Sequence, residues 1–311
     1  MTVLLLAVLA VALAWPVPVL LGRARWVRRA PATAMVLWQA VALAGGLCLV
    51  GTPLMWGLSP FGDSVADAAP AFLAALGDGS WISRLNHDPW IPARIAAVTV
   101  AVLLFGHLVL TLAVTAVRTV AQRRRHRQLV ELLADSSAGS PTRVLPHDVP
   151  LAYCLPGLTG SLTVLSRGLL DQLSERQVAA VVAHERAHLR QRHDVLRLVF
   201  EAWQRAVAWL PTTATAQGAV AGLTEMLADD AALAAHDRED LVRAIALTGE
   251  ATVPGDAQNQ HVGPRDAPVP VTLRLYRLLS PVDPLPLPAR LMIVAGSLCL
   301  AVLPLTVLLL S

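Results

Sequence analysis

The sequence predicts a mainly α-helical, polytopic membrane protein with four transmembrane helices and a cytoplasmic α+β domain between the third and the fourth. Three observations predict this fold class. The 311 residues are 55% hydrophobic and have a mean hydropathy of +0.56, more than a soluble domain of this length needs. The apolar residues gather in four long runs, with one long polar segment before the last of them. The arginines are distributed unevenly between the connecting loops.

Each apolar run has the roughly 20 residues that a helix needs to cross a bilayer. None of the four contains Asp, Glu, Arg or Lys. A single run also fits a buried core helix or a signal peptide, but the first run lacks a basic n-region and a clear cleavage site. Four runs in one chain favour transmembrane helices over these alternatives. The predicted spans cover residues 3–22, 33–52, 95–117 and 291–310.

The orientation of the chain follows from arginine alone, because the sequence contains no lysine. Four arginines lie between the first two spans and five follow the third, whereas the loop at 59–94 carries four aspartates. Arginine-rich loops face the cytoplasm. We therefore expect a multi-pass protein of the cell membrane with an outside N-terminus. The net charge of +3 is then a topology signal, so the expected partner is the lipid bilayer, with no direct binding of nucleic acid.

This orientation divides the chain into a membrane domain (1–117), a cytoplasmic domain (118–290) and a fourth transmembrane helix (291–311). Within the cytoplasmic domain, residues 161–166 have the alternation of a strand. Ser174 and Gln177 form a capping box, which predicts the start of a helix. Other helices are expected over 118–135, 195–210, 223–235 and 272–280, with loops at 136–150 and 251–270 and a linker at 212–222.

The stretch "HERAH" places His184 and His188 four residues apart, so both side chains leave one face of a helix. This spacing lets both imidazoles reach one zinc ion. Glu185 follows His184 directly, where a carboxylate contacts a zinc-bound water without being a ligand and acts as the general base. A charged helix face that matches the pattern by chance is the alternative.

A hydrolytic zinc also needs a third protein ligand and an open fourth position. "TEMLADDAAL" supplies Glu225 on a predicted helix, with Asp229 one turn later on the same face. A glutamate ligand followed by such an aspartate suits a zinc site, because the aspartate accepts the N–H of a metal-bound histidine. An ordinary solvated acidic helix face is the alternative for this pair.

"SLTVLSRGLLDQLSERQVAAVVAHERAHLRQRHD" followed by "EMLADDAA" resembles the core of gluzincin membrane peptidases, shared by HtpX-like and BlaR/MecR-type peptidases. A zinc domain between the third and fourth of four spans is the layout of the BlaR/MecR type. The resemblance implies a zincin-type metallopeptidase domain that binds zinc through His184, His188 and Glu225. It also implies that Glu185 is the catalytic base and that Asp229 supports a zinc ligand.

Two further expectations come from the same resemblance. "TLRLYRLL" is similar to an arginine-containing stretch near the end of such domains, which implies that Arg274 contacts the substrate or the transition state. The receptors of the family carry a penicillin-binding sensor after the fourth span. A chain without lysine has no S-x-x-K acylation motif, so we expect no such sensor in this chain.

The function expected from these features is a membrane-anchored zinc endopeptidase that cuts a cytoplasmic protein, for example a transcriptional repressor, in a signalling role. An HtpX-like quality-control protease and a non-catalytic signalling scaffold are the alternatives. An intramembrane protease is disfavoured, because the helix around His184 carries too many charges for hydrocarbon. The sequence leaves a homo-oligomer open.

Two details of substrate binding are also expected. An extended peptide is expected to pair with the edge of the strand at 161–166. His193, His236 and Tyr276 are unranked candidates to stabilise the oxyanion, and His193 is interpreted as a polar surface residue.

Overall fold

The computed structural model describes residues 1–81, 88–133, 135–136, 142–155, 161–250, 271–280 and 282–310. The chain divides into two compact units, and each is described by itself. Unit 1 comprises Met1–Leu112, Arg205–Ala216 and Leu285–Ser311, and unit 2 comprises Ala113–Gln204 and Gln217–Pro284.

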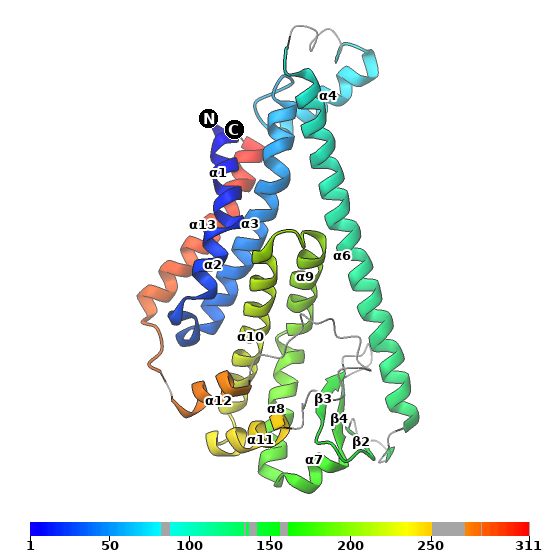
Figure 1. Ribbon diagram of the computed structural model, residues 1–311, viewed down its shortest axis with the longest axis vertical. Helices are drawn as coiled ribbons and strands as arrows, with labels where there is room; N and C mark the ends of the chain where they lie inside the picture. Colours follow the sequence, from blue (N-terminus) through cyan, green and yellow to red (C-terminus); the bar gives the residue numbers. More distant parts are fainter. Residues whose placement is uncertain are drawn as a thin grey trace. The chain divides into compact units, whose positions relative to one another are not determined.

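Unit 1 is a set of apolar helices. Helix α3 packs against α1 and α13, and Figure 1 shows the three side by side. Their contact buries Leu6 of α1 and Cys48 of α3, against which Leu308 of α13 packs. The elements are α1 (Thr2–Ala14), α2 (Pro16–Gly22), η1 (Arg25–Arg29), α3 (Pro31–Leu58), α4 (Val65–Asp78), the first part of α6 (Ile91–Leu133) and α13 (Leu287–Leu310).

The four apolar helices expected from the sequence are confirmed. Within the described residues, four helical stretches are long and apolar enough to cross a membrane: Thr2–Gly22, Pro31–Leu58, Ile91–Leu132 and Leu287–Leu310. The first is interrupted at Trp15, because Pro16 and Pro18 lack the amide hydrogens that would continue α1. The third is longer than predicted: the span at 95–117 and the helix at 118–135 form the single helix α6, since no proline follows Pro92 to break it.

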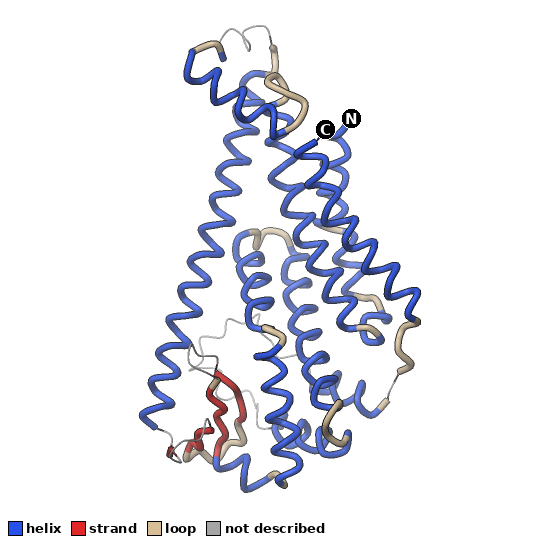
Figure 2. The backbone as a smooth tube through the Cα atoms, turned by 180° about the vertical axis from the view of Figure 1, so that it is seen from behind, coloured by secondary structure: helices blue, strands red, loops and turns tan. Residues whose placement is uncertain are grey.

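Unit 2 contains a sheet with the strand order β1-β2-β4-β3, which Figure 2 shows in red. The predicted strand is confirmed as β4, which pairs parallel with β2 and antiparallel with β3. Because β4 is paired on both sides and fully buried, the expected edge pairing of a substrate with this strand is wrong. The strands are β1 (Asp135–Ser136), β2 (Thr142–Leu145), β3 (Ala152–Leu155) and β4 (Leu162–Ser166).

The prediction of a loop over 136–150 is also wrong in part, because β2 lies within it. The serines and prolines around β2 predict a loop from local composition, but pairing with β4 gives these four residues their partners. Strand formation depends on such neighbours more than on local preference.

The helices of unit 2 follow the sheet. The capping box is present at the start of α8, where the Ser174 side chain accepts from the amide of Gln177 and the Gln177 side chain accepts from the amide of Ser174. The predicted linker at 212–222 is instead helical, since Pro211 occupies the first turn of α10, where its missing amide hydrogen costs nothing. The helices are α7 (Arg167–Gln172), α8 (Glu175–Arg190), α9 (His193–Ala206), α10 (Pro211–Leu233), α11 (Arg238–Glu250) and α12 (Val271–Leu279). The predicted loop at 251–270 lies outside the described residues.

Two apolar clusters fix α8 within unit 2. One joins α8 to α10, α11 and α12 through Ala180, Ala232, Leu241 and Leu278. The other joins it to β4 and α7, where Leu165 and Leu169 are buried and the apolar side chains of α8 pack against them. Burial of one such leucine side chain contributes about 1.5–3 kcal/mol. The helices that carry the candidate site residues are therefore held by shared packing.

Candidate metal centre

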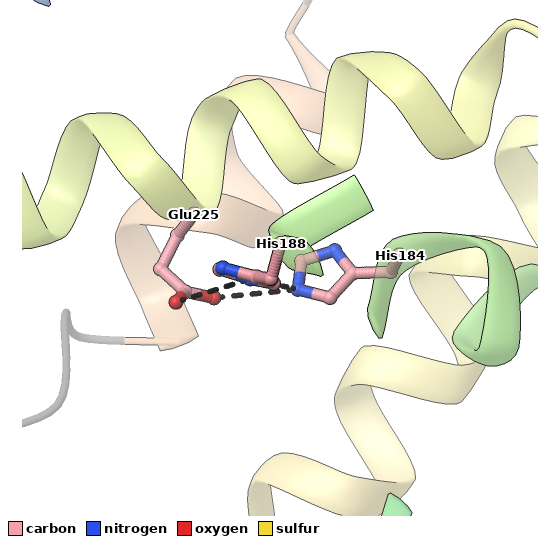
Figure 3. Close-up of side chains that lie close together, drawn as sticks. All are labelled: His184, His188 and Glu225. Atoms are coloured by element: carbon pink, nitrogen blue, oxygen red, sulfur yellow. Dashed lines mark hydrogen bonds and ion pairs between the residues drawn. The ribbon is translucent and has the colours of Figure 1, made fainter. Parts of the chain in front are cut away.

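Helices α8 and α10 bring the three predicted zinc ligands together. The Nε2 atoms of His184 and His188 are 3.2 Å apart. Glu225 Oε2 lies 3.4 Å from His184 Nε2, and Glu225 Oε1 lies 3.6 Å from His188 Nε2. Figure 3 shows both rings and the carboxylate pointing toward one another. The three donor groups therefore converge on one position.

These separations fit a single tetrahedral ion. Zinc binds histidine nitrogen and carboxylate oxygen at about 2.0–2.1 Å, so two ligand atoms on a tetrahedral centre lie roughly 3.4 Å apart. The three ligand atoms all lie within 4.8 Å of one another. Two imidazoles and one carboxylate are also a donor set of catalytic zinc sites, which keep one position open. Both the chemistry and the geometry of the residues suit zinc.

Asp229 contacts the opposite nitrogen of His184. Its Oδ1 lies 2.9 Å from His184 Nδ1, and its side chain is 2% exposed. A carboxylate in this place accepts the Nδ1–H, which leaves the lone pair of Nε2 free to bind a metal. Burial contradicts the alternative of a solvated acidic face for Asp229, whereas its part in metal binding stays a prediction.

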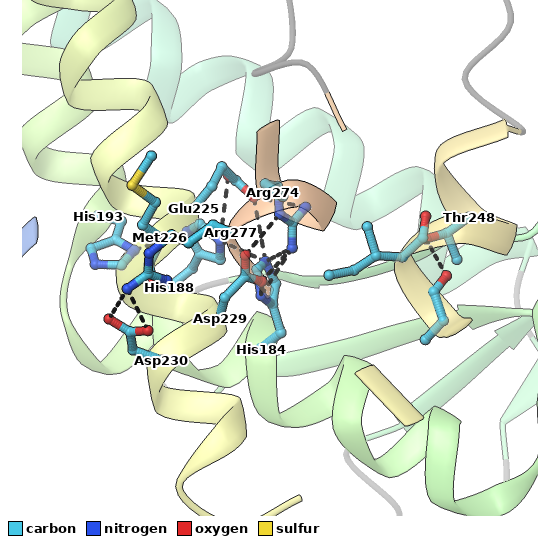
Figure 4. Close-up of polar contacts among 12 residues, drawn as sticks. His184, His188, His193, Glu225, Met226, Asp229, Asp230, Thr248, Arg274 and Arg277 are labelled. Carbon is cyan, nitrogen blue, oxygen red and sulfur yellow. Dashed lines mark hydrogen bonds and ion pairs between the residues drawn. The ribbon is translucent and has the colours of Figure 1, made fainter. Parts of the chain in front are cut away.

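Arg274 of α12 joins the acidic residues of the centre (Figure 4). Its Nη2 and Nε donate to the two carboxylate oxygens of Asp229 at 2.6 and 3.0 Å. Its Nη1 lies 3.2 Å from Glu225 Oε2. A guanidinium that binds a carboxylate in this two-pronged way holds it in a defined orientation. Arg274 thus contacts two residues of the centre, and its predicted contact with substrate stays a prediction.

The charges of the centre suit a bound cation. Burial lowers the pKa of His184, but the contacts with Asp229 and Glu225 outweigh it and raise this pKa to about 9. Burial raises the pKa of Glu225, but His184 and the charge of Arg274 lower it to about 2. Burial lowers the pKa of His188 to about 4. Without a metal the centre holds a proton on His184, and a metal must displace that proton to bind.

A cavity of about 260 Å³ opens beside the three ligand residues, and Glu185 lines it. Burial raises the pKa of the Glu185 carboxyl to about 7, against the opposing effect of the His184 charge. A carboxylate with a pKa near neutrality is suited to accept a proton and to return it. The rest of the lining comes from Val181, Arg197, Leu241, Ile245, Thr248 and Arg274.

The prediction of a surface position for His193 is wrong. Its side chain is 1% exposed, and its Nδ1 lies 3.0 Å from His188 Nδ1. The two-residue turn between α8 and α9 brings the two rings together, a contact that helical spacing does not reveal. His236 and Tyr276 do not line the cavity beside the ligands, and Tyr276 is 59% exposed.

Helix α11 was not predicted from the sequence, although it supplies one wall of the cavity. Leu241, Ala244 and Ile245 have helical spacing and are buried. The acidic residues Glu239 and Asp240 lie in the first turn, where they favour a helix start. These two signals together would have predicted the helix.

The contact between Asp229 and His184 makes a testable prediction. Asp229→Asn keeps an oxygen near Nδ1 but loses the charge that raises the basicity of His184, so we expect about 10- to 100-fold weaker metal binding. Zinc affinity, titrated against a competing chelator, measures the effect.

Asp230→Asn is the matched control, because Asp230 is the next residue of α10 and faces another way. Its carboxylate pairs with Arg277 at 2.8 Å and is 41% exposed, and a surface pair of this kind contributes at most about 1 kcal/mol. Equal zinc affinity of the two variants would show that Asp229 does not orient a ligand.

Three comparisons with known proteins bear on this geometry. A search of curated proteins and a search of solved structures each found no match. Residues 120–247 match the family model of peptidase family M48. The matched range includes His184, Glu185, His188 and Glu225 and ends before Arg274. The match supports a metallopeptidase domain of this family within residues 120–247.

Proposed function

We propose that this chain is a multi-pass membrane zinc endopeptidase that hydrolyses peptide bonds of a cytoplasmic protein. The observation that carries the proposal is the convergence of His184, His188 and Glu225 on one tetrahedral position beside Glu185. The match to peptidase family M48 supports the peptidase chemistry. The four apolar helices support the membrane location.

The residues of the centre have different roles in the proposed hydrolysis. Zinc bound here would supply Lewis acidity, which lowers the pKa of a coordinated water to about 7 and polarises a carbonyl oxygen. Glu185 accepts the proton of the attacking water at its carboxylate and delivers it to the leaving nitrogen. Asp229 keeps the proton of His184 on Nδ1, and Arg274 holds the carboxylates of Asp229 and Glu225 in place.

An extended peptide fits best beside β3. This strand ends the sheet in the part of the chain that the structure describes, and it packs against α8. Helix α8 carries the proposed base, Glu185. Pairing with a strand edge holds a peptide by its main chain and leaves its side chains to select the sequence. The resemblance to BlaR/MecR-type peptidases favours a transcriptional repressor as the substrate, in a signalling role.

Removal and return of the metal test the proposal. We expect the detergent-solubilised protein to cleave labelled casein, to lose this activity after treatment with 1,10-phenanthroline and to regain it when zinc is added. Magnesium is the control, since it prefers six oxygen ligands and does not suit two imidazoles. Full cleavage by protein shown by metal analysis to contain no zinc would contradict the proposal.

The cytoplasmic side of the peptidase unit is tested by cysteine labelling. Ala66→Cys and Asp171→Cys are introduced separately into a protein without Cys48, Cys154 and Cys299, since both positions are exposed. We expect a membrane-impermeant maleimide to label Ala66→Cys in intact cells, and Asp171→Cys only after permeabilisation. The reverse pattern would overturn the orientation and with it the cytoplasmic substrate.

A further inference from the structure

We infer that His193 is a positioning residue of the metal centre, which makes His188 bind metal through Nε2 by accepting a hydrogen bond from its Nδ1. The inference rests on the proposed metal site and names a residue that neither binds the metal nor faces the substrate. His193 is the first residue of α9, and its side chain is almost completely buried behind His188. Figure 4 shows the two rings next to each other.

Three distances carry the inference. His193 Nδ1 lies 3.0 Å from His188 Nδ1, and His193 Nε2 lies 2.9 Å from Gln191 Oε1. The ring centroids of the two histidines are 4.8 Å apart, with an interplanar angle of 85°. The rings therefore meet edge to face, through their nitrogens. A chain of hydrogen bonds runs from Gln191 through His193 to His188.

The chain of hydrogen bonds has one arrangement of protons that allows metal binding. A neutral imidazole carries its proton on one nitrogen and accepts at the other. If His188 binds metal through the lone pair of Nε2, its Nδ1 carries the proton and donates it to His193 Nδ1. His193 must then carry its own proton on Nε2, and the carbonyl oxygen of Gln191 accepts it there. The side chain of Gln191 thus selects the tautomer of His193, which selects the tautomer of His188.

The backbone conformation between α8 and α9 places His193 beside His188. Arg192 has a φ of 51°, a left-handed conformation that costs a non-glycine residue free energy and that surrounding contacts must hold. Hydrogen bonds from the amide of Arg192 to the carbonyl of Leu189 and from the amide of Val195 to the carbonyl of Arg192 close the turn. Only Gln191 and Arg192 separate the end of α8 from the start of α9, so the first residue of α9 lies beside the end of the helix that carries the ligands.

The two ligand histidines are consequently held by different groups. Asp229, a carboxylate, contacts Nδ1 of His184, whereas a neutral ring contacts Nδ1 of His188. In each histidine, the group that contacts Nδ1 leaves the Nε2 atom free to bind metal. The second partner does so without adding another buried negative charge to a centre that already contains Glu225 and Asp229. Loss of the acceptor at 193 should therefore weaken metal binding through the orientation and tautomer of His188.

The test compares two substitutions of one residue in the full-length protein. His193→Phe keeps a ring but removes the acceptor, whereas the side-chain oxygen of His193→Asn reaches about the position of Nδ1 and restores it. We expect zinc affinity to fall about 10- to 100-fold in His193→Phe, as for other changes of a group that orients a ligand, and to stay within a few-fold of wild type in His193→Asn. In the zinc-loaded protein, the Nδ1 proton of His188 should be shifted downfield and exchange slowly in wild type and His193→Asn, and it should lose both properties in His193→Phe.

His236→Phe is the control, because His236 lines a separate cavity on the far face of α8, and it should bind zinc as wild type does. Unchanged affinity in His193→Phe would overturn the inference. An equal loss in both His193 variants would also overturn it, since the effect would then come from packing. Wild-type protein that binds no zinc would overturn the proposed metal site itself, which the wild-type titration reveals before any variant is measured.

Discussion

Glu185→Gln is expected to abolish peptide hydrolysis and to leave the zinc content unchanged. Glutamine has nearly the same size as glutamate and still forms hydrogen bonds, but it does not accept a proton at neutral pH. General acid–base groups contribute about 10²- to 10⁴-fold to the rate. The pKa of about 7 that burial gives Glu185 suits a group that takes a proton and returns it. Cleavage of casein by purified protein measures the loss, and metal analysis measures the zinc.

The same substitution identifies substrates in cells. New protein N-termini that appear with the wild-type chain and not with Glu185→Gln mark sites of cleavage. Glu175→Gln is the matched control, because Glu175 lies on the same helix but is exposed at its first turn. If Glu185→Gln cleaves at the wild-type rate, Glu185 is not the base.

His188→Ala should lose its zinc, because the substitution leaves only His184 and Glu225 of the three converging ligands. The loss of affinity should exceed the roughly 100-fold upper range for groups that only orient a ligand. Chelator competition on detergent-solubilised protein, together with metal analysis after purification, measures the effect. His236→Ala removes the same side chain from the same unit at a position away from the centre and should keep its zinc. Equal zinc content in the two variants would remove His188 from the ligand set.

The predictable part of the site lies within single helices. His184 and His188 are related by one turn of α8, and Glu225 and Asp229 by one turn of α10, so spacing alone places each pair on a face. The capping box at Ser174 marks the start of α8 in the same local way. The apolar spans are local as well, because their length and composition are enough to recognise them.

The features that were missed depend on contacts beyond a single helix or strand. The interior position of β4 comes from its pairing with β2 and β3, and the strand's own residues do not specify how many neighbours it has. His193 looks like one more polar residue after a charged helix until the turn at Arg192 brings it onto His188. Arg274 is separated from Asp229 by 45 residues, so only the folded chain shows their pairing.

X-ray absorption at the zinc edge of the purified wild-type protein tests the central claim most directly. Two imidazoles and one carboxylate predict nitrogen and oxygen neighbours at about 2.0–2.1 Å, with the scattering pattern of imidazole rings and no sulfur. The same spectrum of His188→Ala, loaded with excess zinc, should show fewer imidazole neighbours. A sulfur neighbour at about 2.3 Å, or a wild-type spectrum without imidazole, would contradict the proposed centre.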